Sequence, residues 1–185
     1  MVLELQKHST IIQFFGGIVS KNKLLTIGLI LFVQTNMAFA AADCSKCEST
    51  EIGTKILCAP NAEPSLFDPS NLASPSDRAD AEKNYKDWVE QRNALDAAVA
   101  LPSMHDRSQG VADAERATAA IEQRAMSQCS NAIDRATTAC SAQCPFKGKS
   151  DAEASLTSLR NSLDDSRTLA KSNQDLADVT SSEGN

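Results

Sequence analysis

Six cysteines, arranged in two mirrored groups, constrain the folding of this chain more than any other feature of its 185 residues. Read outward from the middle of the chain, each group begins with a step of eleven residues, which is followed by a step of three in the first group and of four in the second. Two antiparallel segments in register produce such a mirror. The spacing therefore predicts three disulfide bonds within the chain: Cys44–Cys144, Cys47–Cys140 and Cys58–Cys129.

The mirrored groups resemble the paired cysteines of helical hairpins such as the twin CX9C proteins. In this chain ten residues separate Cys47 from Cys58, and ten separate Cys129 from Cys140. The resemblance covers only these two short segments. It implies an antiparallel helical hairpin and carries no function with it.

Two other chemistries are open to the same cysteines. Cys44-x-x-Cys47 has the spacing of a reactive dithiol, but no strand pattern surrounds it to supply the strand–helix context of a thioredoxin-like site. Cys44, Cys47, Cys140 and Cys144 have spacings that suit a zinc ion, although an oxidising compartment does not favour free thiolates. We favour structural disulfides, and we expect no metal ion and no cofactor.

The first forty residues have the pattern of a secretory signal peptide. Lys21 and Lys23 precede an apolar run over 24–33, and small residues lead to an expected cleavage site after Ala40. A membrane span needs about twenty apolar residues, so this run is too short to be an anchor, and no span is expected after cleavage. Residues 1–18 are unusual for such a signal, and we expect the true start of translation near Val19. The mature chain is then periplasmic or extracellular.

Charge and motif content argue against two large classes of function. Residues 41–185 carry 15 Lys+Arg and 23 Asp+Glu, and the basic residues are scattered, so we expect no nucleic-acid binding. His105, expected in a polar turn over 102–109, is the only histidine after the cleavage site, which excludes a pair of histidines for acid–base work. Known hydrolase, zinc-protease and nucleotide-binding motifs are absent from the sequence. The chain is therefore not expected to be an enzyme.

The hydrophobic pattern predicts an all-α fold. Residues 41–58 are expected to be helical because their cysteines fall on one stripe, although Gly53 weakens this segment. Four prolines make residues 59–75 a connector. A helical bundle is expected over 76–179, followed by a disordered tail at 180–185. Its predicted helices span 76–100, 110–144 and 150–178.

Local signals support these helices. Ser74 and Pro75 are expected as N-cap and first residue of the 76–100 helix, and Ser150 and Glu153 as a capping box at the start of the last one. The 76–100 helix carries a heptad-like stripe, as in a coiled coil, which is expected to pack against the next helix. That stripe consists of Ala81, Tyr85, Trp88, Leu95 and Val99.

Together these features predict a disulfide-stapled antiparallel helical hairpin or bundle of three to four helices. The expected function is that of an exported, non-catalytic interaction or structural protein. A protein partner, or a second copy of this chain, is expected to bind an amphipathic helix face, either over 111–140 or along the leucines of 156–179. The alternative is a thiol redox or metal-binding protein that uses Cys44 and Cys47.

Overall fold

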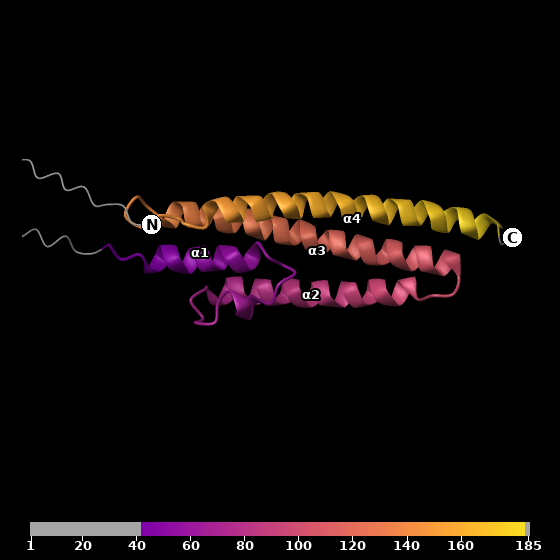
Figure 1. Cartoon of the computed structure of the whole chain (residues 1–185), viewed down its shortest axis with the longest axis horizontal. Helices are drawn as coiled ribbons and strands as arrows, with labels where there is room; N and C mark the ends of the chain where they lie inside the picture. Colours follow the sequence, from indigo (N-terminus) through magenta and orange to yellow (C-terminus); the bar gives the residue numbers. More distant parts are fainter. Residues whose placement is uncertain (1–41, 184–185) are drawn as a thin grey trace, which may run out of the picture. The chain divides into compact units, whose positions relative to one another are not determined.

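The structure is a computed structural model that describes residues 42–183 (Figure 1). These residues form four α-helices and one short 3-10 helix without any strand, which confirms the predicted disulfide-stapled, all-α bundle. The expected signal peptide and the expected start near Val19 lie outside the described residues. The elements are α1 (Ser45–Leu57), η1 (Pro64–Leu66), α2 (Pro75–Val99), α3 (Met104–Ala139) and α4 (Lys149–Glu183).

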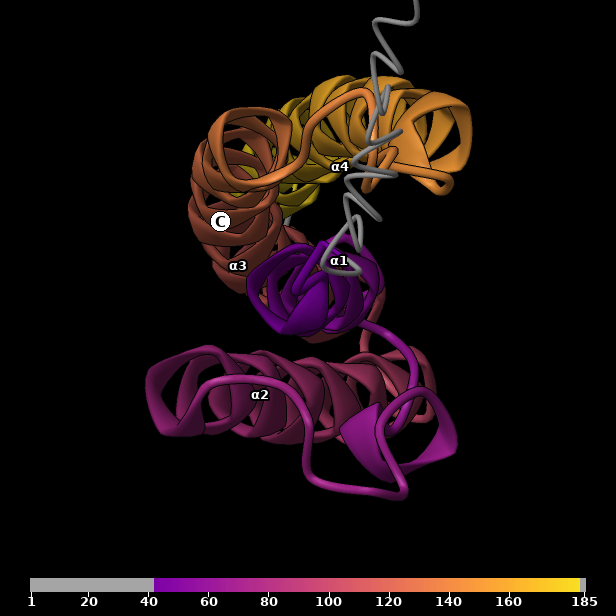
Figure 2. The same cartoon turned by 90° about the vertical axis from the view of Figure 1, so that its left-hand side faces the viewer.

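Helix α3 is the central element of the bundle. It lies beside α4 along most of its length, and it also contacts α1 and α2 (Figure 1). The end-on view shows α1 between α2 on one side and the α3–α4 pair on the other (Figure 2). Within residues 42–183, no helix is long and apolar enough to cross a membrane.

Helix α2 begins where the sequence predicts. The Ser74 side chain accepts a hydrogen bond from the Asp77 backbone N–H at 3.1 Å, and Pro75 occupies the first helical position. Because the cap satisfies one of the free N–H groups of the first turn, the proline-rich connector ends sharply at this point.

Helix α3 begins six residues before the predicted start at 110, so the expected turn over 102–109 is wrong. Ser103 caps the helix by accepting a hydrogen bond from the Asp106 backbone N–H at 3.3 Å. His105 therefore lies in the first helical turn rather than in a polar turn. Its Nδ1 is 2.9 Å from the backbone oxygen of Ala177 on α4.

Helix α3 also ends before the predicted boundary at 144. Its last residue is Ala139, and the backbone of Cys140 is extended (φ −88°, ψ 159°). Pro145 disfavours the helical conformation for the residue before it, so the helix cannot continue up to Cys144. A turn closed by two backbone hydrogen bonds between Ser141 and Cys144 replaces the last predicted helical turn.

Helix α4 is longer than predicted at its C-terminal end. It runs from Lys149 to Glu183, so residues 180–183 are helical and not part of a disordered tail. Ser150 lies inside the first turn and is not the expected cap. Glu153 faces Lys149 instead (Oε1–Nζ 3.8 Å), and the Gly148 carbonyl accepts the first helical hydrogen bond from Ala152.

The core is built largely from small side chains, and α2 contributes little to it. Of the predicted heptad-like stripe only Ala81 is buried, whereas Tyr85 and Trp88 are half-buried and Val99 is 52% exposed. The expected packing of that stripe into the core is therefore wrong for most of its members. The two apolar clusters are Ile56, Leu57, Ala73, Ala81 and Ala132, and Cys58, Cys129, Ile133, Ala152 and Leu159.

Candidate functional site

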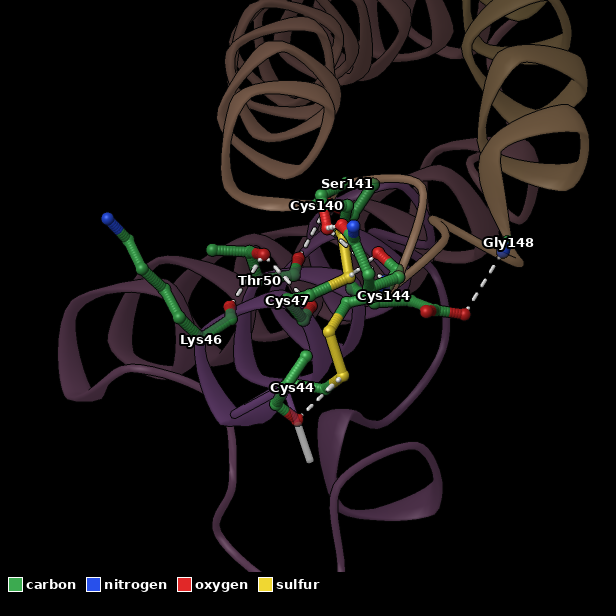
Figure 3. Close-up of a disulfide and its surroundings, with 12 residues drawn as sticks. Cys44, Lys46, Cys47, Thr50, Cys140, Ser141, Cys144 and Gly148 are labelled. Carbon is green, nitrogen blue, oxygen red and sulfur yellow. Dashed lines mark hydrogen bonds between the residues drawn. A yellow bond between two sulfur atoms is a disulfide. The ribbon is translucent and has the colours of Figure 1, made fainter. Parts of the chain in front are cut away.

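The structure places the six sulfur atoms in three disulfide bonds along α1, two at its N-terminal end (Figure 3) and one at its C-terminal end. These bonds are the three pairs that the mirrored spacing predicts, with Cα–Cα distances of 5.4, 4.8 and 4.7 Å. Cys44 and Cys58 are the residues that flank α1, so both ends of this helix are covalently tied. The bonds are Cys44–Cys144, Cys47–Cys140 and Cys58–Cys129.

Each disulfide closes a long loop of the chain. The sequence separations are 100, 93 and 71 residues. In the chain-entropy account, a loop of this size raises the free energy of unfolding by about 4 kcal/mol, because it restricts the unfolded chain. The bridges therefore hold a helix of only 13 residues in place against α3.

The alternative chemistries of the cysteines receive less support from this arrangement. Cys44 and Cys47 are bonded to the 140–144 segment and not to each other, unlike the two thiols of a reactive dithiol pair. The four cysteines considered for zinc do gather at one end of the molecule, but their sulfurs are in disulfide bonds. Over residues 42–183, no group of three or more His, Cys, Asp or Glu side chains is arranged to hold a metal ion.

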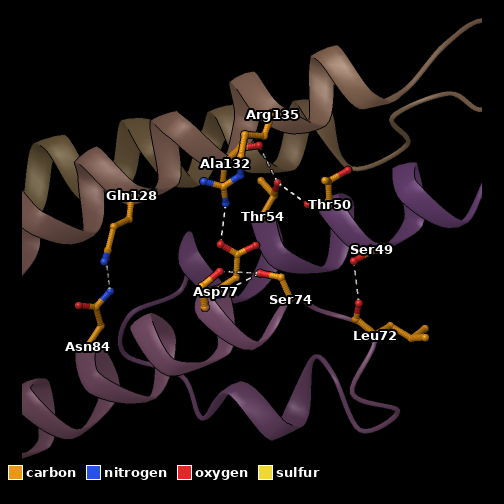
Figure 4. Close-up of polar contacts among 11 residues, drawn as sticks. Ser49, Thr50, Thr54, Leu72, Ser74, Asp77, Asn84, Gln128, Ala132 and Arg135 are labelled. Carbon is orange, nitrogen blue, oxygen red and sulfur yellow. Dashed lines mark hydrogen bonds and ion pairs between the residues drawn. The ribbon is translucent and has the colours of Figure 1, made fainter.

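Gly53, the residue that weakens the predicted helix, is a point where α1 lies close to α2. A Cβ atom at this position would lie 2.6 Å from Oδ2 of Asp77, in the first turn of α2. Asp77 in turn pairs with Arg135 of α3 at 2.6 Å, and Thr54 donates a hydrogen bond to the Ala132 carbonyl at 3.1 Å (Figure 4). The glycine thus allows three helices to meet around one ion pair.

The connector between α1 and α2 is organised by a buried carboxylate that the sequence analysis missed. Asp68 is 2% exposed and accepts hydrogen bonds from the backbone N–H groups of Leu72 and Ala73, at 2.7 and 3.0 Å. Its charge is paired with Arg78, 2.5 Å away. This carboxylate gives the proline-rich segment a defined path into the Ser74 cap.

Polar side chains, rather than the predicted aromatic stripe, join the middle of α2 to α3. Asn84 is fully buried, donates to Gln128 at 2.6 Å and accepts from Arg124 at 2.8 Å. Arg124 also pairs with Asp87 at 2.6 Å. The hydrogen bond from Lys83 (2.8 Å) lowers the pKa of the Asp87 carboxyl, Arg124 lowers it further, and partial burial opposes both.

Helix α1 lies against α3, between α2 and α4, and it is much shorter than these three helices (Figure 1, Figure 2). Beyond its last residue, two adjoining cavities of about 270 and 240 Å3 are both lined by Trp88 of α2, Glu122 of α3 and Ser162 of α4. We call this region the open groove. Its far part is also lined by Leu95, Glu115 and Leu169.

Two buried carboxylates on α3 form the floor of the open groove. Glu115 and Glu122 are 9% and 7% exposed. Glu122 Oε1 accepts a hydrogen bond from the Ser162 hydroxyl, whereas Oε2 has no hydrogen-bond partner among the described residues. Burial raises the pKa of the Glu115 carboxyl; a hydrogen bond from Ser166 opposes this rise, and the neighbouring Glu122 adds to it.

The sequence analysis did not identify Glu115 and Glu122 as candidate site residues. They are seven residues apart on α3 and therefore lie on the same side of that helix. Each lies four residues after a member of the predicted apolar face, Val111 and Thr118. Such an acidic pair beside an apolar stripe is the signal that would have pointed to them.

Comparison with known proteins gives no relative: no family model, no curated protein and no solved structure matches this chain. Of the two faces expected to bind a partner, the 111–140 face is fully buried at Ala125, Cys129 and Ala136, whereas Thr118 of the same face lines the open groove. The leucine face of α4 is divided. Leu159 and Leu163 are buried, whereas Leu169 and Leu176 are exposed.

Proposed function

We propose that this chain is an exported, disulfide-stabilised helical protein that acts by binding another protein and not by catalysis. The observation that carries the proposal is the set of three intramolecular disulfides around α1, because such bonds are typical of proteins that fold in an oxidising compartment. The signal pattern of residues 1–40 supports the same compartment. The mature protein then works in the periplasm or outside the cell.

The binding role is supported by apolar side chains that the bundle leaves uncovered. Leu169 and Leu176 of α4 are 49% and 38% exposed, and they lie seven residues apart on one side of the helix. In a chain with so few large apolar side chains, leaving two of them exposed on one helix favours a surface for a partner.

The compartment is tested on protein recovered from cells that express the full chain. We expect an N-terminus at Ala41, six cysteines that resist alkylation until a reductant is added, and peptides linked through Cys58 and Cys129. Protein that stays in the cytosol with free thiols would contradict export. A free pair at Cys44 and Cys47, or bound zinc, would instead support the redox or metal-binding alternative.

The binding role is tested by placing a photo-crosslinking amino acid at Leu169. The matched control position is Asn161, which is exposed on the same helix and does not line the open groove. We expect a discrete crosslinked product from position 169 in intact cells and none from position 161. Equal crosslinking at both positions, or none at either, would contradict a specific binding surface on α4.

A further inference from the structure

The open groove lies next to the end of helix α1. Helix α1 lies over α3, between α2 and α4, and ends at Leu57 (Figure 1, Figure 2), and the next residue, Cys58, lines the near cavity. Gly110 of α3 and Ala98 of α2 approach each other closely, five residues before the first α3 residue that lines the far cavity. The α3 residues that line the two cavities run from Glu115 to Glu122, which is about 10 Å at about 1.5 Å per residue. That length suits about two turns of a helix.

The negative charge of the open groove favours a helix that carries basic side chains. Glu115, Glu122 and Asp165 line it, against a single cationic side chain, Arg92, whose guanidinium lies 3.9 Å from Asp96. A buried carboxylate oxygen without a hydrogen-bond partner, such as Oε2 of Glu122, is unfavourable until a donor reaches it. A lysine or arginine side chain supplies both the donor and the opposite charge.

Apolar and aromatic side chains in the open groove also suit a helix that carries both basic and apolar residues. Trp88 lines both cavities beside Glu122, and an indole face attracts an ammonium or guanidinium group. Leu95 and Leu169 lie on the opposite walls of the far cavity and offer apolar contact to a helix between them. The open groove therefore combines negative charge at its floor with apolar walls.

We propose that the open groove binds an amphipathic helix of another protein that presents two basic side chains, seven residues apart, to Glu115 and Glu122. Its apolar residues pack against Trp88, Leu95 and Leu169. A second copy of this chain is less suited to the site, because residues 41–185 carry eight more acidic than basic residues. The docking site rests on the proposed binding role, and it adds the chemistry of the partner.

The probe is a synthetic 18-residue amphipathic peptide with leucines on its apolar face and two lysines seven residues apart. The control peptide has glutamate in place of both lysines. Trp88 is the only tryptophan of the chain, so its fluorescence reports on the open groove directly. With the oxidised protein, we expect the lysine peptide to change the emission of Trp88 saturably, and the glutamate peptide to leave it unchanged.

Variants of the protein test which groups bind the peptide. We expect the double variant Glu115→Gln, Glu122→Gln to bind the lysine peptide at least about tenfold more weakly, because both charge pairs are lost. Asp134→Asn removes a carboxylate from an exposed position on the same helix and should leave binding unchanged. Equal affinity of the double variant and the unaltered protein, or equal binding of both peptides, overturns the proposal.

The proposed binding role and the proposed docking site can be contradicted by different results. If a partner crosslinks at position 169 but the lysine peptide does not displace it, the binding role stands and the groove proposal is overturned. If the peptide binds with the expected dependence on Glu115 and Glu122 but nothing crosslinks in cells, the groove proposal stands without its physiological partner. Self-association that disappears in the double variant makes a second copy the occupant, which also overturns the proposal.

Discussion

At the scale of single residues, buried polar groups determine how the helices meet. Asp68 orders the connector, Asp77 and Arg135 join α2 to α3, and Asn84 is buried where an aromatic contact was expected. These groups satisfy one another by hydrogen bonds or opposite charge. Glu115 and Glu122 differ from these groups, because they accept hydrogen bonds from Ser166 and Ser162 but are two like charges on the floor of the open groove.

Replacing Glu115 tests the consequence of that burial. Because the pKa of Glu115 is raised in the folded protein, the folded state holds the proton to higher pH than the unfolded chain does. The Glu115 side chain does not lower the free energy of unfolding below the ordinary pKa of glutamate, about 4.3. It lowers the free energy of unfolding as the pH rises through its raised pKa. We expect Glu115→Gln to raise the urea midpoint at pH 7 and to lose this advantage near pH 4.

The control for this titration is Glu82→Gln, a change at an exposed position of α2. Its stability should follow that of the unaltered protein from pH 4 to pH 7. The stability of Glu115→Gln and that of the unaltered protein are both plotted against pH. If the two curves stay parallel over this range, ionisation of the Glu115 carboxyl does not destabilise the fold.

At the scale of the helices, α2 and α3 are in close contact near the turn that joins them. A Cβ atom on Gly110 would lie 2.9 Å from Cβ of Ala98, which is closer than real Cβ contacts, and 3.6 Å from its Cα. Neither atom can move without its backbone, so an alanine at position 110 has to push the two helices apart. The close contact is the reason that a glycine occupies the second turn of a 36-residue helix.

We expect Gly110→Ala to lower the free energy of unfolding by about 1–3 kcal/mol, the usual range for overpacking. Helix propensity alone predicts the opposite sign, a gain of up to about 1 kcal/mol. The measurement is chemical denaturation of the oxidised protein, in a cycle with Ala98→Gly and the double variant. The double variant should be more stable than the sum of the two single effects predicts. Simple additivity, or a stabilising effect of Gly110→Ala, would show that the helices are not in close contact here.

At the scale of the whole molecule, the three disulfides differ in how far the bundle protects them. Cys58 and Cys129 are 6% and 0% exposed and belong to an apolar cluster. Cys44 is half-buried, and its partner Cys144 lies in the turn that follows α3. A reductant therefore reaches Cys44–Cys144 through local opening, whereas Cys58–Cys129 requires a larger part of the bundle to open.

Timed reduction at low dithiothreitol concentration, followed by alkylation and mass spectrometry, tests this order. We expect Cys44–Cys144 to open first and Cys58–Cys129 last. Removal of the protected bridge by Cys58→Ala with Cys129→Ala should cost up to about 4 kcal/mol, from the loss of a loop of 71 residues. Reduction of Cys58–Cys129 before the other two bonds would contradict the protection inferred from burial.

Much of this fold could be predicted because its signals are local. Proline density marked the connector, Ser74 and Pro75 marked the start of α2, and the mirrored cysteines gave an antiparallel register for α1 and α3. Helix ends were harder to predict. Ser103 could cap a helix or belong to a turn, and only packing against α4, where His105 meets Ala177, favours the longer helix.

The amino-acid sequence by itself determined the helical class, the connector and the pairing of the cysteines, because each follows from spacing or propensity along one dimension. The tertiary structure alone decided that polar residues join α2 to α3 and that α1, with 13 residues, lies among helices of 25 to 36 residues. That difference in length leaves Trp88 and the carboxylates of Glu115 and Glu122 along an open groove. No local pattern specifies such a site, since its walls come from three helices that meet only in the folded bundle.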